Sequence, residues 1–171
     1  MIQIYTGNGK GKTTGAVGSA IRCVGAGKKV LFCQFLKDGT SGECSLLKTL
    51  SGVECLLPER EFGFTFTMDE ETRKEAMAYY RTYWDKIEQA MAEKNYDMIV
   101  LDEICDACCT NMIDVEKVLK FLDKYGKTVE IILTGRKPSE TLAEKAEYIT
   151  EMKKIKHPFD KGVSARKGIE F

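Results

Sequence analysis

The sequence has no excess of charge of either sign, because its 26 lysines and arginines are balanced by 26 aspartates and glutamates. No overall field therefore draws in nucleic acid or an anionic membrane, and we expect neither as a partner. The apolar run at the start, Ile2 to Tyr5, is too short for a secretory signal, and no later segment approaches the roughly 20 apolar residues that span a bilayer. We therefore expect a soluble, cytoplasmic protein.

Histidine and paired cysteine motifs are also scarce. The only histidine is His157, and the cluster of Cys105, Cys108 and Cys109 is not followed by a second C-x-x-C motif. Because zinc and iron–sulfur sites usually need such a partner motif, we interpret the cluster as small side chains packed near the start of a helix. A metal or redox role stays as the alternative. The odd total of seven cysteines favours reduced thiols over a disulfide framework.

What the sequence does contain is an alternation of short β-like runs with longer helical patterns, without an internal repeat or a low-complexity linker. Strands separated by helices predict right-handed crossovers and a doubly wound, mostly parallel α/β sheet. With 171 residues, 43% of them hydrophobic, we expect a single domain over residues 1–171. The expected strands are 2–5, 29–35, 53–57, 97–102 and 128–135, with a last one within 146–155, and the expected helices are 13–27, 69–94 and 114–125.

The glycine-rich segment TGNGKGKTT, residues 6–14, lies between the first expected strand and the first expected helix. It nearly satisfies the P-loop pattern G-x-x-x-x-G-K-[ST], with Gly11, Lys12 and Thr13 at its end but Thr6 where the first glycine is expected. Backbone N–H groups of the glycines and the positive end of the helix form an anion cradle, which Lys12 completes. The sequence therefore predicts a P-loop NTPase (RecA-like) fold, in which the Thr13 hydroxyl can hold Mg²⁺.

The run MIVLDE places Asp102 and Glu103 at the end of an apolar strand. P-loop proteins bind the metal that bridges the phosphates at such a position, and ligands of these sheets bind at the carboxyl ends of the strands. The loop and the acidic pair together predict a site for Mg²⁺ and a nucleoside triphosphate. Arg136 follows another expected strand and is either a phosphate contact or a surface residue in a turn. These motifs do not specify which bond breaks.

Several segments match one family in order along the chain. Through YTGNGKGKTT, QFLKDGTSGE, GFTF, VLDE, LTGR and the C-terminal KHPFDKGVSARKGIEF, the sequence resembles the ATP:corrinoid adenosyltransferases. The resemblance covers nearly the whole chain, and its first and last segments are more distinctive than a generic P-loop. It implies transfer of the 5′-deoxyadenosyl group of ATP to Co(I) of a corrinoid such as cobalamin, with release of triphosphate, in the synthesis or salvage of adenosylcobalamin.

The resemblance also implies cofactors and partners. ATP and the corrinoid are the substrates, Mg²⁺ (or Mn²⁺) accompanies the triphosphate, a flavoprotein donates electrons, and relatives are typically homodimers. Because Co(I) is a strong nucleophile, the protein needs no general base and instead orients ATP, which lies reversed in this family, and neutralises the departing triphosphate. Relatives often have an N-terminal helical arm over the corrinoid, whereas this sequence starts at the strand, so we expect a more exposed corrinoid or one covered by a partner.

Individual roles are carried over by position. The resemblance implies that Lys12 and Glu103 are catalytic, with Lys12 countering the charge of the triphosphate, and that Thr13, Asp102 and Glu103 bind the metal. Phe64 and Phe66 of GFTF stand where the family places aromatics against the corrin ring to displace the lower axial ligand of Co(II), although relatives carry tryptophan at the second position. The tail from His157 to Glu170 is implied to line or brace the site. The residues implied to bind ATP or corrinoid are Gly7, Asn8, Gly9, Lys10, Gly11, Lys12, Thr13, Thr14, Phe64, Phe66 and Arg136.

Two other interpretations use only the generic motifs. A P-loop nucleoside kinase or ATPase would release ADP, although the paired-cysteine zinc motif of the thymidine-kinase type is absent from this sequence. A non-catalytic corrinoid-binding or nucleotide-binding protein would bind its ligands without turning them over. For GFTF, a hydrophobic loop packed on the core is the structural alternative.

Overall fold

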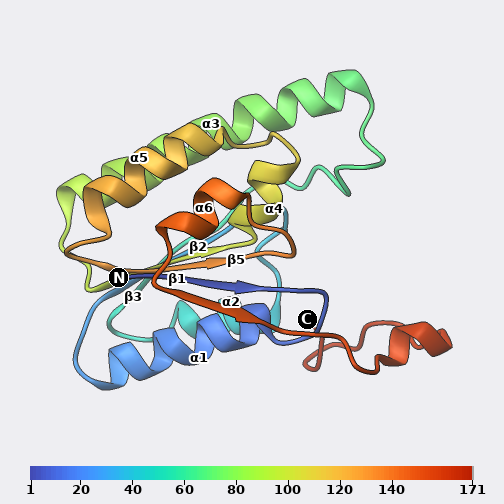
Figure 1. Ribbon diagram of the computed structural model, residues 1–171, viewed down its shortest axis with the longest axis horizontal. Coiled ribbons are helices and arrows are strands. Elements are labelled where there is room, and N and C mark those ends of the chain that lie inside the picture. The colour runs from blue at the N-terminus through green and yellow to red at the C-terminus, as the bar shows by residue number, and fades with distance from the viewer. Residues whose placement is uncertain (171) are drawn as a thin grey trace.

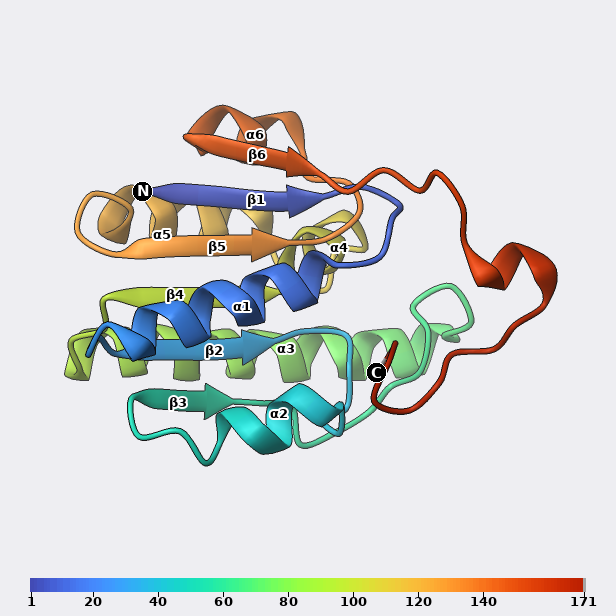
Figure 2. The ribbon, with the colours of Figure 1, turned by 90° about the horizontal axis from the view of Figure 1, so that it is seen from below.

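The computed structural model describes residues 1–170, and its centre is a six-stranded parallel sheet with strand order β3–β2–β4–β5–β1–β6. All six strands point the same way, so their carboxyl ends meet at one edge (Figure 2). This confirms the predicted doubly wound α/β sheet, which is entirely rather than mostly parallel. The strands are β1 (Ile2–Thr6), β2 (Val30–Gln34), β3 (Val53–Leu56), β4 (Met98–Asp102), β5 (Glu130–Thr134) and β6 (Tyr148–Glu151).

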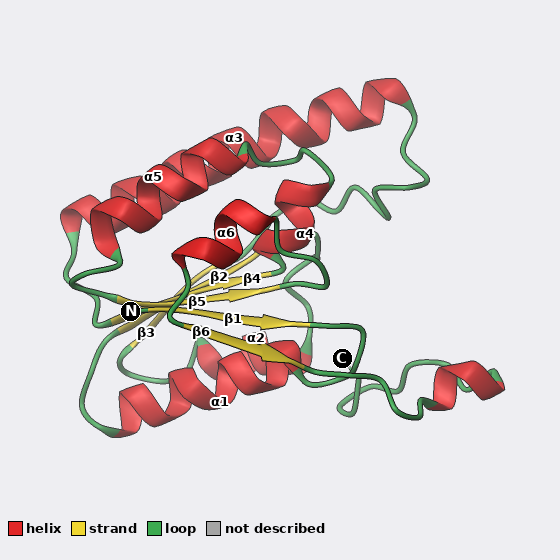
Figure 3. Ribbon diagram, viewed as in Figure 1, coloured by secondary structure: helices red, strands yellow, loops and turns green. Residues whose placement is uncertain are grey.

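Helices cover both faces of the sheet (Figures 1 and 3). On one face lie α1 (Lys12–Gly25) and α2 (Gly42–Leu47), and on the other lie α3 (Glu70–Glu93), α4 (Ile104–Cys109), α5 (Val115–Tyr125) and α6 (Glu140–Lys145). The long helices α1, α3 and α5 match the three predicted ones closely. The short helices α2, α4 and α6 have six residues each, which is too few turns for a period of 3.6 to show in the sequence. Within residues 1–170, none of the helices has both the length and the apolar composition for crossing a membrane.

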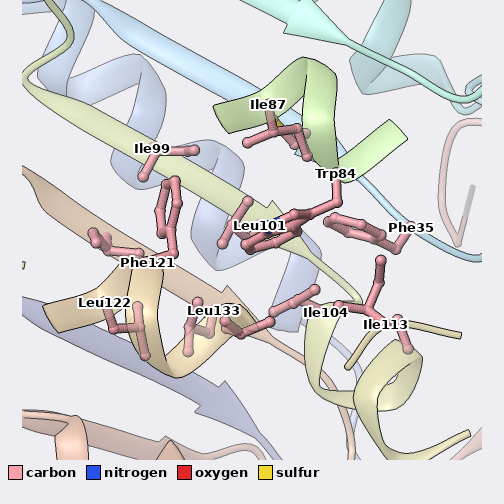
Figure 4. Close-up of a cluster of buried hydrophobic side chains, with 14 of the residues drawn as sticks. Phe35, Trp84, Ile87, Ile99, Leu101, Ile104, Ile113, Phe121, Leu122 and Leu133 are labelled. Atoms are coloured by element: carbon pink, nitrogen blue, oxygen red, sulfur yellow. The ribbon is translucent and has the colours of Figure 1, made fainter. Parts of the chain in front are cut away.

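The larger part of the core lies between the sheet and the pair α3 and α5, with Trp84 at its centre (Figure 4). The Trp84 ring lies 5.3 Å from the ring of Phe121 and 6.4 Å from that of Phe35, measured between centroids. Burying a large apolar side chain contributes about 1.5–3 kcal/mol, so this face fixes α3 on the sheet. The apolar stripe of this helix is buried throughout: Ala76, Tyr80, Tyr83, Trp84, Ile87 and Met91.

Within the described part of the chain, some of the helices begin with a side-chain cap, whereas α1, α2 and α4 do not. Asp69 accepts a hydrogen bond from the Thr72 N–H at the start of α3, and Asp114 accepts one from the Glu116 N–H at the start of α5. Such caps satisfy backbone donors that have no partner within the helix. Among the described residues, α1 follows Gly11 without a side-chain cap, which leaves the N–H groups of its first turn available to an anion.

We expect the core of this sheet to tolerate truncation poorly. Leu101 in β4 is fully buried, so Leu101→Ala should lower the free energy of unfolding by about 2–5 kcal/mol, through lost transfer energy and a cavity. Leu46 in α2 is 57% exposed, and Leu46→Ala should change it by no more than about 0.5 kcal/mol. Urea unfolding of both variants measures the difference, and equal losses would contradict the assignment of β4 to the core.

Candidate nucleotide-binding site

The loop between β1 and α1 has the backbone conformation of a phosphate-binding loop. Gly7 and Gly11 have φ angles of +101° and +117°, which residues with a Cβ adopt only under strain. Thr6 is the last residue of β1, and its hydroxyl donates to the backbone oxygen of Arg136 at 2.9 Å. The positive-φ backbone therefore begins at Gly7, one residue after the position of the first glycine in the standard pattern.

The residues that follow β6 contact this loop through backbone hydrogen bonds. The Gly9 N–H donates to the Met152 oxygen at 2.6 Å, and the Asn8 Oδ1 accepts from the Lys154 N–H at 2.9 Å. A Cβ on Gly7 or Gly9 would lie 2.6 or 2.5 Å from the Met152 oxygen, so glycine is required here by close packing. These polar groups of Asn8 and Gly9 are thus used to anchor the loop.

Lys12, at the start of α1, folds over the loop. Its Nζ donates to the backbone oxygens of Gly7 and Gly9, both at 2.9 Å. Burial lowers the pKa of Lys12, the carboxylate of Glu103 opposes that shift, and Arg136 adds to it. The ammonium group therefore lies within electrostatic reach of both Glu103 and Arg136.

The carboxylate of Asp102 is the polar centre of the site. It is fully buried at the end of β4. Its Oδ1 accepts hydrogen bonds from the hydroxyls of Thr13 at 2.9 Å and Thr134 at 2.7 Å. Its Oδ2 accepts from the Gln34 Nε2 at 3.1 Å and the Lys37 Nζ at 2.9 Å. Charged and polar donors from four segments thus compensate a charge that would otherwise be costly to bury.

Glu103 follows Asp102 in an unusual backbone conformation. It is the N-cap residue of α4 and has a φ of +63°, and its N–H donates to the Thr134 hydroxyl at 2.8 Å. Burial and the neighbouring charge of Asp102 raise the pKa of Glu103 to about 7, although Lys37 opposes the shift. A strained residue with a perturbed pKa beside a phosphate-binding loop is typical of a functional position.

Arg136 is held by its backbone, whereas its side chain is exposed. Its N–H donates to the Asp106 carboxylate at 2.7 Å, and its oxygen accepts from Thr6. Asp106 is half-buried on α4 and contributes to the electrostatic environment of Lys12. The turn after β5 is therefore tied to both the P-loop strand and α4.

An open cleft of about 820 Å³ adjoins the start of α1, a volume in the range of small-molecule sites. Four segments line it: the P-loop and α1, the chain from β2 into α2, the loop before α3, and the end of the tail. The lining includes Lys10, Thr13, Thr14, Lys37, Phe64 and Glu170.

Phe64 and Phe66 lie at the outer side of this cleft as a stacked pair. Their ring centroids are 5.3 Å apart with an interplanar angle of 18°, and the two side chains are 71% and 82% exposed. Phe62 of the same loop instead packs against Tyr79 and Tyr80 of α3. Phe64 lines the cleft directly, whereas Phe66 contacts it through the stack. The loop thus presents two aromatic faces outward rather than packing both on the core.

The cysteine cluster has the properties of structural thiols. Cys105 is buried, Cys108 is half-buried and Cys109 is exposed, and all three are free. Burial raises the pKa of Cys105 and that of Cys108, the latter to about 12, the opposite of a reactive thiol. Within residues 1–170, we find no preformed group of three or more His, Cys, Asp or Glu side chains suited to a metal.

The tail projects beyond the carboxyl edge of the sheet (Figure 2). It carries the short 3₁₀ helix η1 (Pro158–Lys161), whose first N–H, that of Phe159, donates to the His157 Nδ1 at 3.2 Å. The single histidine therefore has a capping contact. The end of the tail returns to the cleft at Glu170, which Arg166 holds in an ion pair at 2.8 Å.

Three polar partners of Asp102 were not predicted as site residues: Gln34, Lys37 and Thr134. Gln34 and Thr134 could have been predicted from the sequence. The apolar runs of β2, β4 and β5 each end in a polar residue, namely Gln34, Asp102 and Thr134. Parallel strands bring such ends together at one edge. Lys37 lies in the loop after β2, where the pattern of the sequence does not fix its direction.

A P-loop before α1 and an acidic residue at the end of a central strand define a P-loop nucleotide-binding protein. The fold agrees with this class: the structure of EssC (ATPases 2 and 3) from Geobacillus thermodenitrificans superposes with a TM-score of 0.51 at 15% identity, covering 98% of this chain. The chain spans only 34% of that structure, and the likeness concerns the fold alone.

Sequence comparison gives the family. Residues 1–171 match the model of ATP:corrinoid adenosyltransferase BtuR/CobO/CobP. The chain is 37% identical to the corrinoid adenosyltransferase of Escherichia coli K12, covering 100% of this chain and 85% of that protein. It is 35% identical to those of Sinorhizobium sp and Salmonella typhimurium, covering 100% of this chain and 80% and 85% of those proteins. The chain therefore belongs to the ATP:corrinoid adenosyltransferase family, as its motifs predict.

The contact between the P-loop and Met152, directly after β6, can be tested by adding one methyl group. Gly9→Ala places a Cβ against the Met152 oxygen and should lower the free energy of unfolding by about 1–3 kcal/mol, because backbone must move. It should also speed proteolysis after residue 152. Gly18→Ala, with open space around it in α1, should be neutral or stabilising by up to about 1 kcal/mol. Urea unfolding compares the two, and a neutral Gly9→Ala would show that this packing is not needed.

Proposed function

We propose that this protein transfers the 5′-deoxyadenosyl group of ATP to Co(I) of a corrinoid and releases triphosphate. Family membership over the whole chain carries the proposal, and the geometry of the P-loop supports it. In the reaction, the electron pair of Co(I) forms a bond to C5′ of the ribose, the C5′–O bond breaks, and triphosphate leaves with the electron pair of the broken C5′–O bond. Cobalt thereby becomes formally Co(III).

The described residues fit the needs of a triphosphate leaving group. We assign the cradle to the loop from Gly7 to Thr14, with the uncapped start of α1 and the ammonium of Lys12 neutralising the charge. Arg136 lies close enough to affect Lys12 electrostatically, and we assign it to the same anion. This chemistry needs no general base because Co(I) is itself a strong nucleophile, and family membership favours it over the kinase or ATPase interpretation.

The donor set fits Mg²⁺ or Mn²⁺. Mg²⁺ prefers oxygen ligands and usually combines one or two carboxylates with substrate phosphates. Thr13, Asp102 and Glu103 supply a hydroxyl and two carboxylates at the mouth of the P-loop, and we assign the metal to them. When bound, the metal would neutralise charge on the triphosphate.

Phe64 and Phe66 form the proposed corrinoid contact. A flat macrocycle can lie on exposed aromatic faces, and this stacked pair borders the cleft that contains Thr13. We further propose that the protein works in the cytoplasm as a homodimer and that a flavoprotein supplies the electrons.

The activity can be tested by incubating the protein with ATP, Mg²⁺ and chemically reduced cobalamin. We expect adenosylcobalamin, seen by its light-sensitive spectrum, and equimolar triphosphate. Lys12→Ala should reduce the rate by about 100-fold or more, mainly through weaker triphosphate binding and neutralisation, whereas Lys28→Ala, an exposed lysine at the far end of α1, should retain it. ADP or phosphate without a cobalt–carbon product would refute the proposal.

The role of the aromatic pair is tested by changing the starting oxidation state of cobalt. Phe66→Ala should leave the reaction of prereduced Co(I) nearly unchanged but slow an assay that starts from Co(II) and a reductant. Tyr148→Ala removes another exposed aromatic, on β6, and should affect neither assay. Equal losses for Phe66→Ala in both assays would mean that the ring does not act on the reduction step.

A further inference from the structure

Lys37 occupies a position that neither the P-loop nor the acidic pair explains. Its Nζ lies 2.9 Å from the Asp102 Oδ2 and 3.2 Å from the Thr13 Oγ1. The ammonium thus contacts two of the three side chains assigned to the metal. A lysine and a divalent cation cannot share this position, because both are positive and both need the same oxygen atoms.

The hydrogen bonds of Asp102 leave no acceptor position open. An ionised carboxylate offers about four lone-pair sites, and here each oxygen accepts two hydrogen bonds. A metal can therefore bind this carboxylate directly only after one of the four donors has left.

Three of the four donors are fixed by their surroundings. Gln34 and Thr134 are fully buried at the ends of β2 and β5. Gln34 also accepts from the Cys44 thiol at 3.6 Å, and Thr134 also accepts from the Glu103 N–H. Thr13 belongs to the first turn of α1.

Lys37 differs from these three in place and in freedom. It lies in the loop between β2 and α2, its side chain is 32% exposed, and it lines the cleft. Its four-carbon stem can turn without movement of the backbone. Its ammonium group forms an ion pair with the Asp102 carboxylate at 2.9 Å.

We propose that Lys37 is an exchangeable internal cation, which neutralises Asp102 until a divalent metal takes its position beside Thr13 and Asp102. The inference rests on the proposed function in one respect, namely that a divalent cation accompanies the triphosphate. Before the metal binds, the ion pair with Lys37 compensates the buried negative charge of Asp102. After exchange, the displaced ammonium faces the cleft, where Lys10 also lies, and both charges meet the triphosphate.

The test measures Mn²⁺ binding to the full-length protein without nucleotide, by electron paramagnetic resonance of free Mn²⁺. Lys37→Met removes the competing charge and should tighten Mn²⁺ binding by at least about tenfold, given the strength of charge interactions at this range. Lys37→Arg keeps the charge and should not tighten it. Lys94→Met breaks an ion pair with Glu54 at the amino end of the sheet and should leave Mn²⁺ affinity unchanged.

A purely structural lysine would give a different result. In that case Lys37→Met would lower stability, but its Mn²⁺ affinity would equal that of the unaltered protein. A second contrary result is that neither the variant nor the unaltered protein binds Mn²⁺. Either outcome would overturn the proposal. If Lys37→Met does not fold, acetylation of the unaltered protein gives the answer: Mn²⁺ should speed labelling of Lys37 relative to Lys94, and an unchanged ratio would overturn the exchange. None of these readouts depends on adenosyl transfer, so the two proposals can fail separately.

Discussion

The arrangement of the site depends on one buried carboxylate, that of Asp102. A buried charge without partners would cost several kcal/mol, about 3–5 kcal/mol when one partner of a buried pair is removed. Here the partners come from β2, β5, α1 and the loop after β2. Satisfying this one charge therefore fixes four segments of the chain relative to one another, at the edge where the P-loop lies.

The strand order separates the P-loop from the strand that carries Asp102. β1, which carries the P-loop, and β4, which carries Asp102, are not neighbours, because β5 lies between them. Thr134 at the end of β5 binds the end of β4 twice: its hydroxyl donates to Asp102 and accepts from the Glu103 N–H. α1 then brings Thr13 to the same carboxylate from the other side. The Thr13 hydroxyl thus links the P-loop helix directly to the acid, although β5 lies between their two strands.

Periodicity and turn chemistry predicted much of this structure, and the limits have physical causes. The strands and long helices were predictable because buried runs such as MIVLD and the stripe through Trp84 carry strong patterns. The six-residue helices were not, since they are too short for a period. Glycines, Lys12 and the acidic pair could be proposed from local sequence, whereas Lys37 and Met152 enter the site through contacts between distant segments, which local patterns do not encode.

The departure of the loop from the P-loop pattern has a local explanation in these contacts. Thr6 remains in β1 because its hydroxyl is bound by the turn after β5, so the left-handed turn starts at Gly7. The chain after β6 then packs so closely that a Cβ at Gly7 or Gly9 would collide with the Met152 oxygen. The loop is therefore held by contacts with two segments, the turn after β5 and the residue directly after β6. The chain after β6 reaches the cleft again at Glu170, so this C-terminal segment both supports the phosphate-binding loop and lines the cleft beside it.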